Sequence, residues 1–316
     1  MDFDALFSNI GQHTVDGLAK GAIYALVALG YTLVYGVLRL INFAHSEVFM
    51  VGTFAIMWTW TGLGITDNPS IGVGVSMLLL GALIGAAVSG GTAVLVELVA
   101  YRPLRRKNAP SLVFLITAIG VSLTLTEIFG LFTGNGERKI QGMPSVIKQT
   151  PVFDLGFVSI TNRQLITLVA AFAMMIALDQ FINRTRYGRG VRAVAQNPDT
   201  AALMGVNKNR VIVLIFLLGG LMAGVAAVLW NMRYGVTKFD IGFVIGLKAF
   251  TAAVLGGIGN LRGALVGGLA LGVIEVYFAT LTESKWEDVW AFVVLVIVLM
   301  FRPTGILGES LGRARA

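Results

Sequence analysis

The sequence predicts an all-α protein that is embedded in a membrane, as one helical bundle of about eight or nine spans arranged in two related halves. Hydrophobic residues make up 56% of the 316 residues, and charged residues make up only 13%. A soluble globular domain carries roughly 25% charged residues. The chain therefore has too few polar side chains to cover a surface that faces water, and its mean hydropathy of +0.80 agrees with this.

Apolar segments recur along the whole chain at lengths close to the ~20 residues that cross a bilayer core as a helix. Two of them, the second and the seventh, carry a charge (Glu47 and Lys248) beside small residues, so we expect broken or re-entrant helices there. Many of the 39 glycines fall in small-xxx-small pairs, which predicts close helix packing. The segments are Val15–Leu38, Ile41–Thr61, Ile71–Tyr101, Leu112–Phe132, Leu165–Phe181, Val211–Trp230, Phe243–Gly257, Ala264–Leu281 and Val289–Phe301.

Basic residues predict the orientation, because lysine and arginine collect in cytoplasmic loops. The whole chain is expected to be one transmembrane domain, with Arg184–Arg210 as a cytoplasmic loop and a cytoplasmic C-terminus. Counting every apolar segment as a crossing places the N-terminus outside. The acidic start lacks the basic region of a signal peptide, so the first segment is expected to be retained. Aromatic residues that favour the headgroup layer mark the outer ends: Trp58, Trp60, Trp230, Tyr234, Trp286 and Trp290.

The composition also excludes several kinds of chemistry. There are no cysteines and only two histidines, so thiolate catalysis, disulfides and a histidine-cluster metal site are excluded. No catalytic residue and no metal ligand is predicted. The phosphate-binding pattern G-x-x-x-x-G-K-[ST] is missing, so the chain is expected to bind no ATP and no other cofactor of its own. The net charge of +7 is explained by cytoplasmic loops and predicts no nucleic-acid partner.

Polar residues inside the two interrupted segments are the candidates for a substrate path. An ionisable group at mid-membrane costs about 2.5–3.5 kcal/mol and therefore needs a partner or water. Polar interruptions at corresponding places in two halves indicate a path at the interface of the repeats. For the first segment a helix-capping role of Asn42 or Ser46 is an equally good explanation. The predicted pathway residues are Asn42, His45, Ser46, Glu47, Lys248 and Thr251.

The cytoplasmic loop contains a short helix signal. Asn197 suits the N-cap, Pro198 suits the first helical position, and Asp199 complements the positive end of the helix dipole. Gly205 suits the position after the helix, which predicts a helix over Pro198–Met204. A helix this short is unstable alone, so it packs either on its own bundle or on a partner protein.

Four stretches of the sequence resemble one family. RAVAQNPDTAALMGVN at 192–207 resembles the cytoplasmic loop of bacterial ABC-transporter permeases for branched-chain amino acids, the LivH type. NFAHSEVFMVG at 42–52 and GLKAFTAAVLGGIGN at 246–260 are similar to that family's first-half and second-half signatures, and GLAKGAIYAL at 17–26 fits its opening. Ser46 departs from the family, which usually has glycine there, and stiffens the break before Glu47.

This resemblance implies a multi-subunit importer in the bacterial inner membrane, in contact with membrane lipid. The chain pairs with a second permease, identical or different (LivM-like). Two ATPase subunits bind and hydrolyse ATP, and an extracytoplasmic binding protein delivers leucine, isoleucine or valine. The predicted helix becomes a coupling helix that docks in an ATPase. The residues expected to couple are Arg192, Gln196, Asn197, Pro198, Asp199, Ala202 and Gly205.

Other functions stay open from the residues alone. Permeases of the same type move urea, amides or other small amino acids. An ion-coupled secondary transporter with Glu47, Lys248 and Glu275 as relay groups is a different class, as is a passive channel. Dependence on ATP and on a binding protein separates the importer from both.

Overall fold

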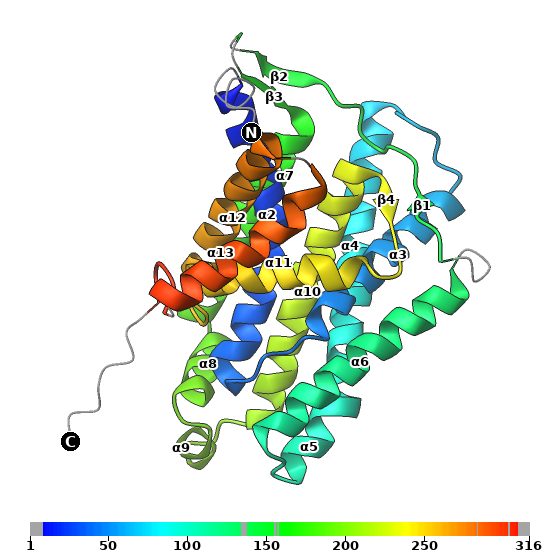
Figure 1. Ribbon diagram of the computed structural model, residues 1–316. Helices are drawn as coiled ribbons and strands as arrows, with labels where there is room; N and C mark the ends of the chain where they lie inside the picture. The colour runs from blue at the N-terminus through cyan, green and yellow to red at the C-terminus, as the bar shows by residue number, and fades with distance from the viewer. Residues whose placement is uncertain are drawn as a thin grey trace.

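A bundle of long helices forms the protein, with two small antiparallel ribbons at one end and two short helices at the other (Figure 1). The computed structural model describes residues 9–133, 138–154, 156, 158–282, 284–302 and 304–308. The long helices are α2 (Ile10–Leu38), α3 (His45–Gly62), α4 (Ile71–Val96), α6 (Ser111–Phe132), α7 (Asn162–Arg184), α10 (Lys208–Tyr234), α11 (Ile241–Gly256), α12 (Leu261–Leu281) and α13 (Glu287–Phe301).

Short elements connect these helices. A π-helix, η1 (Glu97–Tyr101), extends α4 into α5 (Arg102–Arg106), and a 3-10 helix, η3 (Ser284–Trp286), precedes α13. Two helices, α8 (Arg186–Gln196) and α9 (Pro198–Leu203), lie at the lower end in Figure 1 together with α5. Strand β1 (Gln141–Gly142) pairs with β4 (Val236–Thr237), and β2 (Pro151–Asp154) pairs with β3 (Ser159–Thr161).

All predicted apolar segments form helices, which confirms an all-α polytopic membrane bundle. Within the described ranges, six of these helices are long and apolar enough to cross a membrane: α2, α4 continued through α5, α6, α7, α10 and α12. Helix α11 has 16 residues, which at a rise of about 1.5 Å per residue is shorter than a bilayer core of about 30 Å. Helix α3 begins inside the bundle, because the ring of its first residue, His45, packs against Gly30 in the second half of α2.

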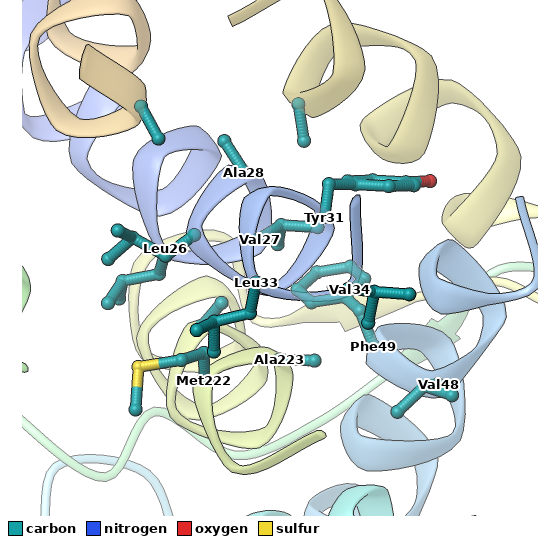
Figure 2. Packing of buried hydrophobic residues seen from close by; sticks show 14 of the residues in the cluster. Leu26, Val27, Ala28, Tyr31, Leu33, Val34, Val48, Phe49, Met222 and Ala223 are labelled. Carbon is teal, nitrogen blue, oxygen red and sulfur yellow. The ribbon is translucent and has the colours of Figure 1, made fainter. Parts of the chain in front are cut away.

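Helix α2 is the centre of the core, and it is buried on all sides from Gly21 to Val34. Figure 2 shows Leu26, Val27 and Leu33 of α2 beside Met222 and Ala223 of α10, with Val48 and Phe49 of α3 on another side. By contrast α4, α6 and α7 expose most of their apolar side chains, as helices that contact lipid do.

Glycines let the backbones of neighbouring helices touch. A Cβ atom at Gly17 of α2 would lie 2.6 Å from the Cα atom of Val273 in α12, closer than real Cβ atoms approach. Gly85 and Gly224 bring α4 and α10 together in the same way. These contacts agree with the expected packing role of the small residues.

The aromatic prediction was wrong for Trp60. Its side chain is fully buried and its Nε1 donates a hydrogen bond to the Met77 carbonyl oxygen at 3.0 Å, so it belongs to the core. Trp58, two residues earlier, is 50% exposed and stacks on Phe129. The neighbouring helix α4 covers Trp60, whereas Trp58 lies on the side of α3 that faces Phe129 of α6. Arg313 and Arg315, two of the C-terminal arginines, lie outside the described residues.

Candidate functional site

A network of hydrogen bonds determines where α3 begins. The Asn42 side-chain oxygen accepts from the backbone N–H of Ala44 at 3.1 Å and from the Tyr101 hydroxyl at 2.9 Å. The Ser46 hydroxyl donates to the Phe43 carbonyl oxygen at 2.7 Å. The residue that precedes the helix is Ala44, so neither Asn42 nor Ser46 is its N-cap. Asn42 instead closes a turn one step earlier, as asparagine side chains do before helices.

Glu47 is buried, and within the described part of the chain its hydrogen-bond partners are hydroxyl groups. Its Oε1 accepts from the Ser122 hydroxyl at 3.1 Å and from the Ser46 hydroxyl at 3.5 Å. Its Oε2 has no hydrogen-bond partner, and among the residues that the structure describes no basic side chain pairs with it. Gly242 of α11 lies against it, where any side chain would collide with the Ser46 carbonyl oxygen. An isolated carboxyl group therefore lies at the seam of α3, α6 and α11.

Two other predicted pathway residues are enclosed within the bundle. The His45 ring meets the Tyr31 ring edge-on with centroids 5.0 Å apart, and its Nε2 has no partner. Thr251 is fully buried, and its hydroxyl donates to the Leu247 carbonyl oxygen at 2.9 Å. The structure brings Asn42, His45 and Ser46 together through the start of α3.

Lys248 belongs to a different group of side chains. Its Nζ forms an ion pair with Glu275 of α12, with Asp288 of α13 at 2.5 Å and with Glu287 at 3.5 Å. Lys20 of α2 pairs with Glu287, and with Glu275 at 3.5 Å. We call Lys20, Lys248, Glu275, Glu287 and Asp288 the ionic cluster. One carboxylate oxygen from each of Glu275, Glu287 and Asp288 lies within 4.8 Å of the others, and the two ammonium groups among them make the cluster a salt-bridge network.

Helix α11 separates Glu47 from Lys248. Gly242 and Gly246 face Glu47 and Ser46 of α3, whereas Lys248 points to the opposite side, where its Nζ lies 3.5 Å from the Tyr24 hydroxyl. The two charges that sequence analysis assigned to one path are thus on two faces of one helix.

A cavity of about 430 Å³ borders the ionic cluster, and we call it the α11 cavity. It lies between α2, α13, the end of α10, the β4 turn and one face of α11. Its lining combines both signs of charge with aromatic and aliphatic groups: Lys20, Tyr24, Ile140, Trp230, Tyr234, Val236, Thr237, Lys238, Asp240, Ile241, Val244, Ile245, Lys248, Glu287 and Asp288.

At the far end from the ribbons, α9 is built as its capping residues predict. The Asn197 side-chain oxygen accepts from the backbone N–H groups of Asp199 and Thr200, both at 3.0 Å. Gly205 has a positive φ of 84°, so it ends this turn without strain. The helix runs over Pro198–Leu203, one residue shorter than predicted. Only its Ala201 is buried against the bundle.

Polar contacts connect this end to the start of α3. Arg105 of α5 pairs with Glu97 of the π-helix and donates to the Asn209 side chain of α10 at 3.0 Å. Tyr101, the last residue of the π-helix, reaches Asn42. Arg192 donates to the Ile182 carbonyl oxygen and so ties α8 to the end of α7.

Residues 13–299 match the family described as branched-chain amino acid transport system / permease component. The chain belongs to this permease family. It is 43% identical over 301 residues to the high-affinity branched-chain amino acid transport system permease protein BraD of Pseudomonas aeruginosa, covering 94% of this chain and 95% of that one. It is 40% identical over 301 residues to LivH of Escherichia coli K12, with the same coverage. The autoinducer 2 import system permease protein LsrC of Salmonella choleraesuis is 30% identical, covering 82% of this chain and 76% of that one.

In this permease, sequence reasoning missed three of the five members of the ionic cluster. Glu287, Asp288 and Lys20 are not among the predicted pathway residues, and no partner is predicted for them. One signal could have found the two acids. They lie directly before the last predicted apolar segment, at the N-terminal end of a helix, where acidic side chains are stabilised. Nothing in the sequence places them opposite Lys248.

Proposed function

We propose that this permease is the membrane-spanning subunit of an ATP-driven, binding-protein-dependent importer of leucine, isoleucine and valine. The observation that carries the proposal is the identity of 40–43% to relatives named as high-affinity branched-chain amino acid permeases, extending over 94% of the chain. The bacterial inner membrane is the proposed location, with α9 and the C-terminus in the cytoplasm. This orientation rests on the basic residues around α5, α8 and α9.

The proposed partners are a second, LivM-like permease, two ATPase subunits and an extracytoplasmic binding protein. The exposed tip of α9 supports an ATPase docking role: Leu203 is 88% exposed and Met204 is 81% exposed, although both are apolar. Residues proposed for this contact are Arg192, Gln196, Asn197, Pro198, Asp199, Ala202 and Gly205. ATP is bound and hydrolysed on the partner, since this chain lacks a phosphate-binding loop.

The proposed path follows the seam of α3, α6 and α11, with Asn42, His45, Ser46 and Glu47 along it, while Thr251 lies on the other face of α11. The start of α3 inside the bundle supports this role, because irregular backbone at membrane depth occurs beside protein or water. Lys248, the remaining pathway residue, contributes from the α11 cavity on the other face of α11.

Uptake into proteoliposomes tests the proposal. The purified permease with its partner permease and ATPases is reconstituted, and labelled leucine is supplied on loaded binding protein. We expect accumulation only with ATP and binding protein together. Accumulation driven by a proton or sodium gradient without nucleotide would overturn the proposal in favour of a secondary transporter. Flux without ATP or binding protein would identify a channel, and uptake of urea but not leucine would reassign the substrate.

A further inference from the structure

The α11 cavity has the chemistry to recognise a free amino acid. We propose that it is a transient binding site for a zwitterionic α-amino acid with an apolar side chain. The proposal rests on the proposed function, and it adds a substrate-recognition site within the permease itself. The lining offers cations for a carboxylate, carboxylates for an ammonium group, and apolar surface for a side chain.

The charges that face the cavity balance one another. Lys20 and Lys248 oppose Glu287 and Asp288, while Glu275 lies behind them, fully buried, and pairs with both lysines. Glu275 thus holds the lysine side chains in position without itself lining the cavity. A neutral set of fixed charges of both signs fits a ligand that is neutral overall but carries both charges.

One ion pair at the cavity wall can exchange partners. The Lys248 side chain is 4% exposed and stays anchored by Glu275, whereas the Asp288 side chain, 2.5 Å away, is 56% exposed. An incoming carboxylate replaces Asp288 on Lys248, and the released Asp288 accepts the ammonium group of the same ligand. One pair breaks and two form, so no charge is left unpaired.

A ligand with one charge does not complete this exchange. A carboxylate alone displaces Asp288 and leaves it without a partner, and an amine alone leaves Lys248 without its third carboxylate. Each analogue therefore forms one ion pair where the amino acid forms two, and because Asp288 is exposed to water the difference is that of one charge-assisted contact. The geometry therefore selects the amino acid over its deaminated or decarboxylated analogue.

The rest of the cavity suits a branched aliphatic side chain. Its 430 Å³ lies within the range of about 300–1,000 Å³ that small-molecule sites occupy. Ile241, Val244 and Ile245 supply an aliphatic wall along α11. Trp230 supplies a rigid aromatic wall, since its Nε1 donates to the Val236 carbonyl oxygen at 3.1 Å and its ring lies 4.1 Å from that of Tyr234.

Ligand-observed NMR tests the site directly. The complete transporter, without its binding protein, is placed in lipid nanodiscs, and saturation transfer to L-leucine, isocaproate and isoamylamine is titrated. We expect transfer to leucine at millimolar concentration and far weaker transfer to the two analogues. Asp288→Asn removes the ammonium partner at an exposed position, and we expect leucine to bind about tenfold more weakly, the factor for one charge-assisted hydrogen bond.

Glu127→Gln is the matched control. Glu127 is also an exposed acid in an ion pair, at 2.5 Å from Arg138, and does not line the cavity, so its loss should leave leucine binding unchanged. Equal transfer to all three ligands, or an unchanged affinity in Asp288→Asn, would overturn the site and leave the ionic cluster as a purely structural network.

The same purified transporter, tested for uptake in proteoliposomes and for binding in nanodiscs, separates the site from the proposed function. ATP-driven leucine uptake together with no leucine binding in the nanodiscs refutes the site alone. Leucine binding that Asp288→Asn weakens, together with no ATP-driven uptake, refutes the proposed importer and keeps the site. Loss of both refutes both.

Discussion

Removing the charge of Lys248 is expected to destabilise the protein more than removing the charge of Glu275. Lys248→Met leaves the fully buried Glu275 with one cation, Lys20, at 3.5 Å. Breaking a buried ion pair costs about 3–5 kcal/mol. Because Lys20 still pairs with Glu275, we expect Lys248→Met to lower the free energy of unfolding by about 3 kcal/mol, the lower end of this range. Glu275→Gln leaves Lys248 with Asp288 at 2.5 Å and Glu287 at 3.5 Å, so its cost is that of one charged hydrogen bond, about 2 kcal/mol.

The double variant Lys248→Met/Glu275→Gln reports the coupling between the two residues. Because neither residue then leaves the other unpaired, its cost should fall below the sum of the single variants by about 1–3 kcal/mol. Glu127→Gln, which breaks the exposed pair with Arg138, should cost under about 1 kcal/mol. Denaturant titration of the purified protein in mixed micelles, followed by circular dichroism, measures all four. Equal costs for the two single variants, or strict additivity, would refute this account of the cluster.

Three further variants test other parts of the structure. Ala202→Glu, at the exposed tip of α9, should prevent co-purification of the ATPase subunits while membrane insertion stays normal; retained co-purification would remove α9 from the contact. Gly21→Leu should prevent folding, because a Cβ atom at this position would lie 2.8 Å from a backbone Cα atom of α12. Gly120→Leu is the control and should express normally, because the space around Gly120 is open. Equal yields of folded protein from the two variants would contradict the packing described. Tyr101→Phe removes one of the two donors to the buried Asn42 side-chain oxygen, and the free energy of unfolding in the same micelle titration should fall by about 1 kcal/mol. An unchanged free energy of unfolding would indicate that a water molecule replaces the hydroxyl group.

The helices were predictable because each depends on local sequence. Hydropathy over ~20 residues locates the spans, and capping chemistry locates α9 to within one residue through Asn197 and Gly205. Both signals are read from residues a few positions apart, and neither needs the fold.

The site was predictable only in part, because it depends on which way each helix faces. Glu47 and Lys248 each occupy an interrupted segment, but the rotation of α11 puts them on opposite faces, and one sequence does not reveal that rotation. The ionic cluster joins Lys20 to Glu287 across 267 positions of the chain. Trp60 was misplaced for the same reason, since its burial depends on α4 and not on its own helix.

The central position of α2 sets an order of assembly. It is made before α10, α11 and α12, which form its walls. Until then it faces lipid, which its apolar residues tolerate, but Lys20 has no carboxylate partner before Glu275 and Glu287 are synthesised. An unpaired lysine in the membrane costs about 2.5–3.5 kcal/mol at mid-depth. Insertion of α12 and α13 therefore relieves a penalty incurred when α2 is made, and a chain that stops short of them keeps it.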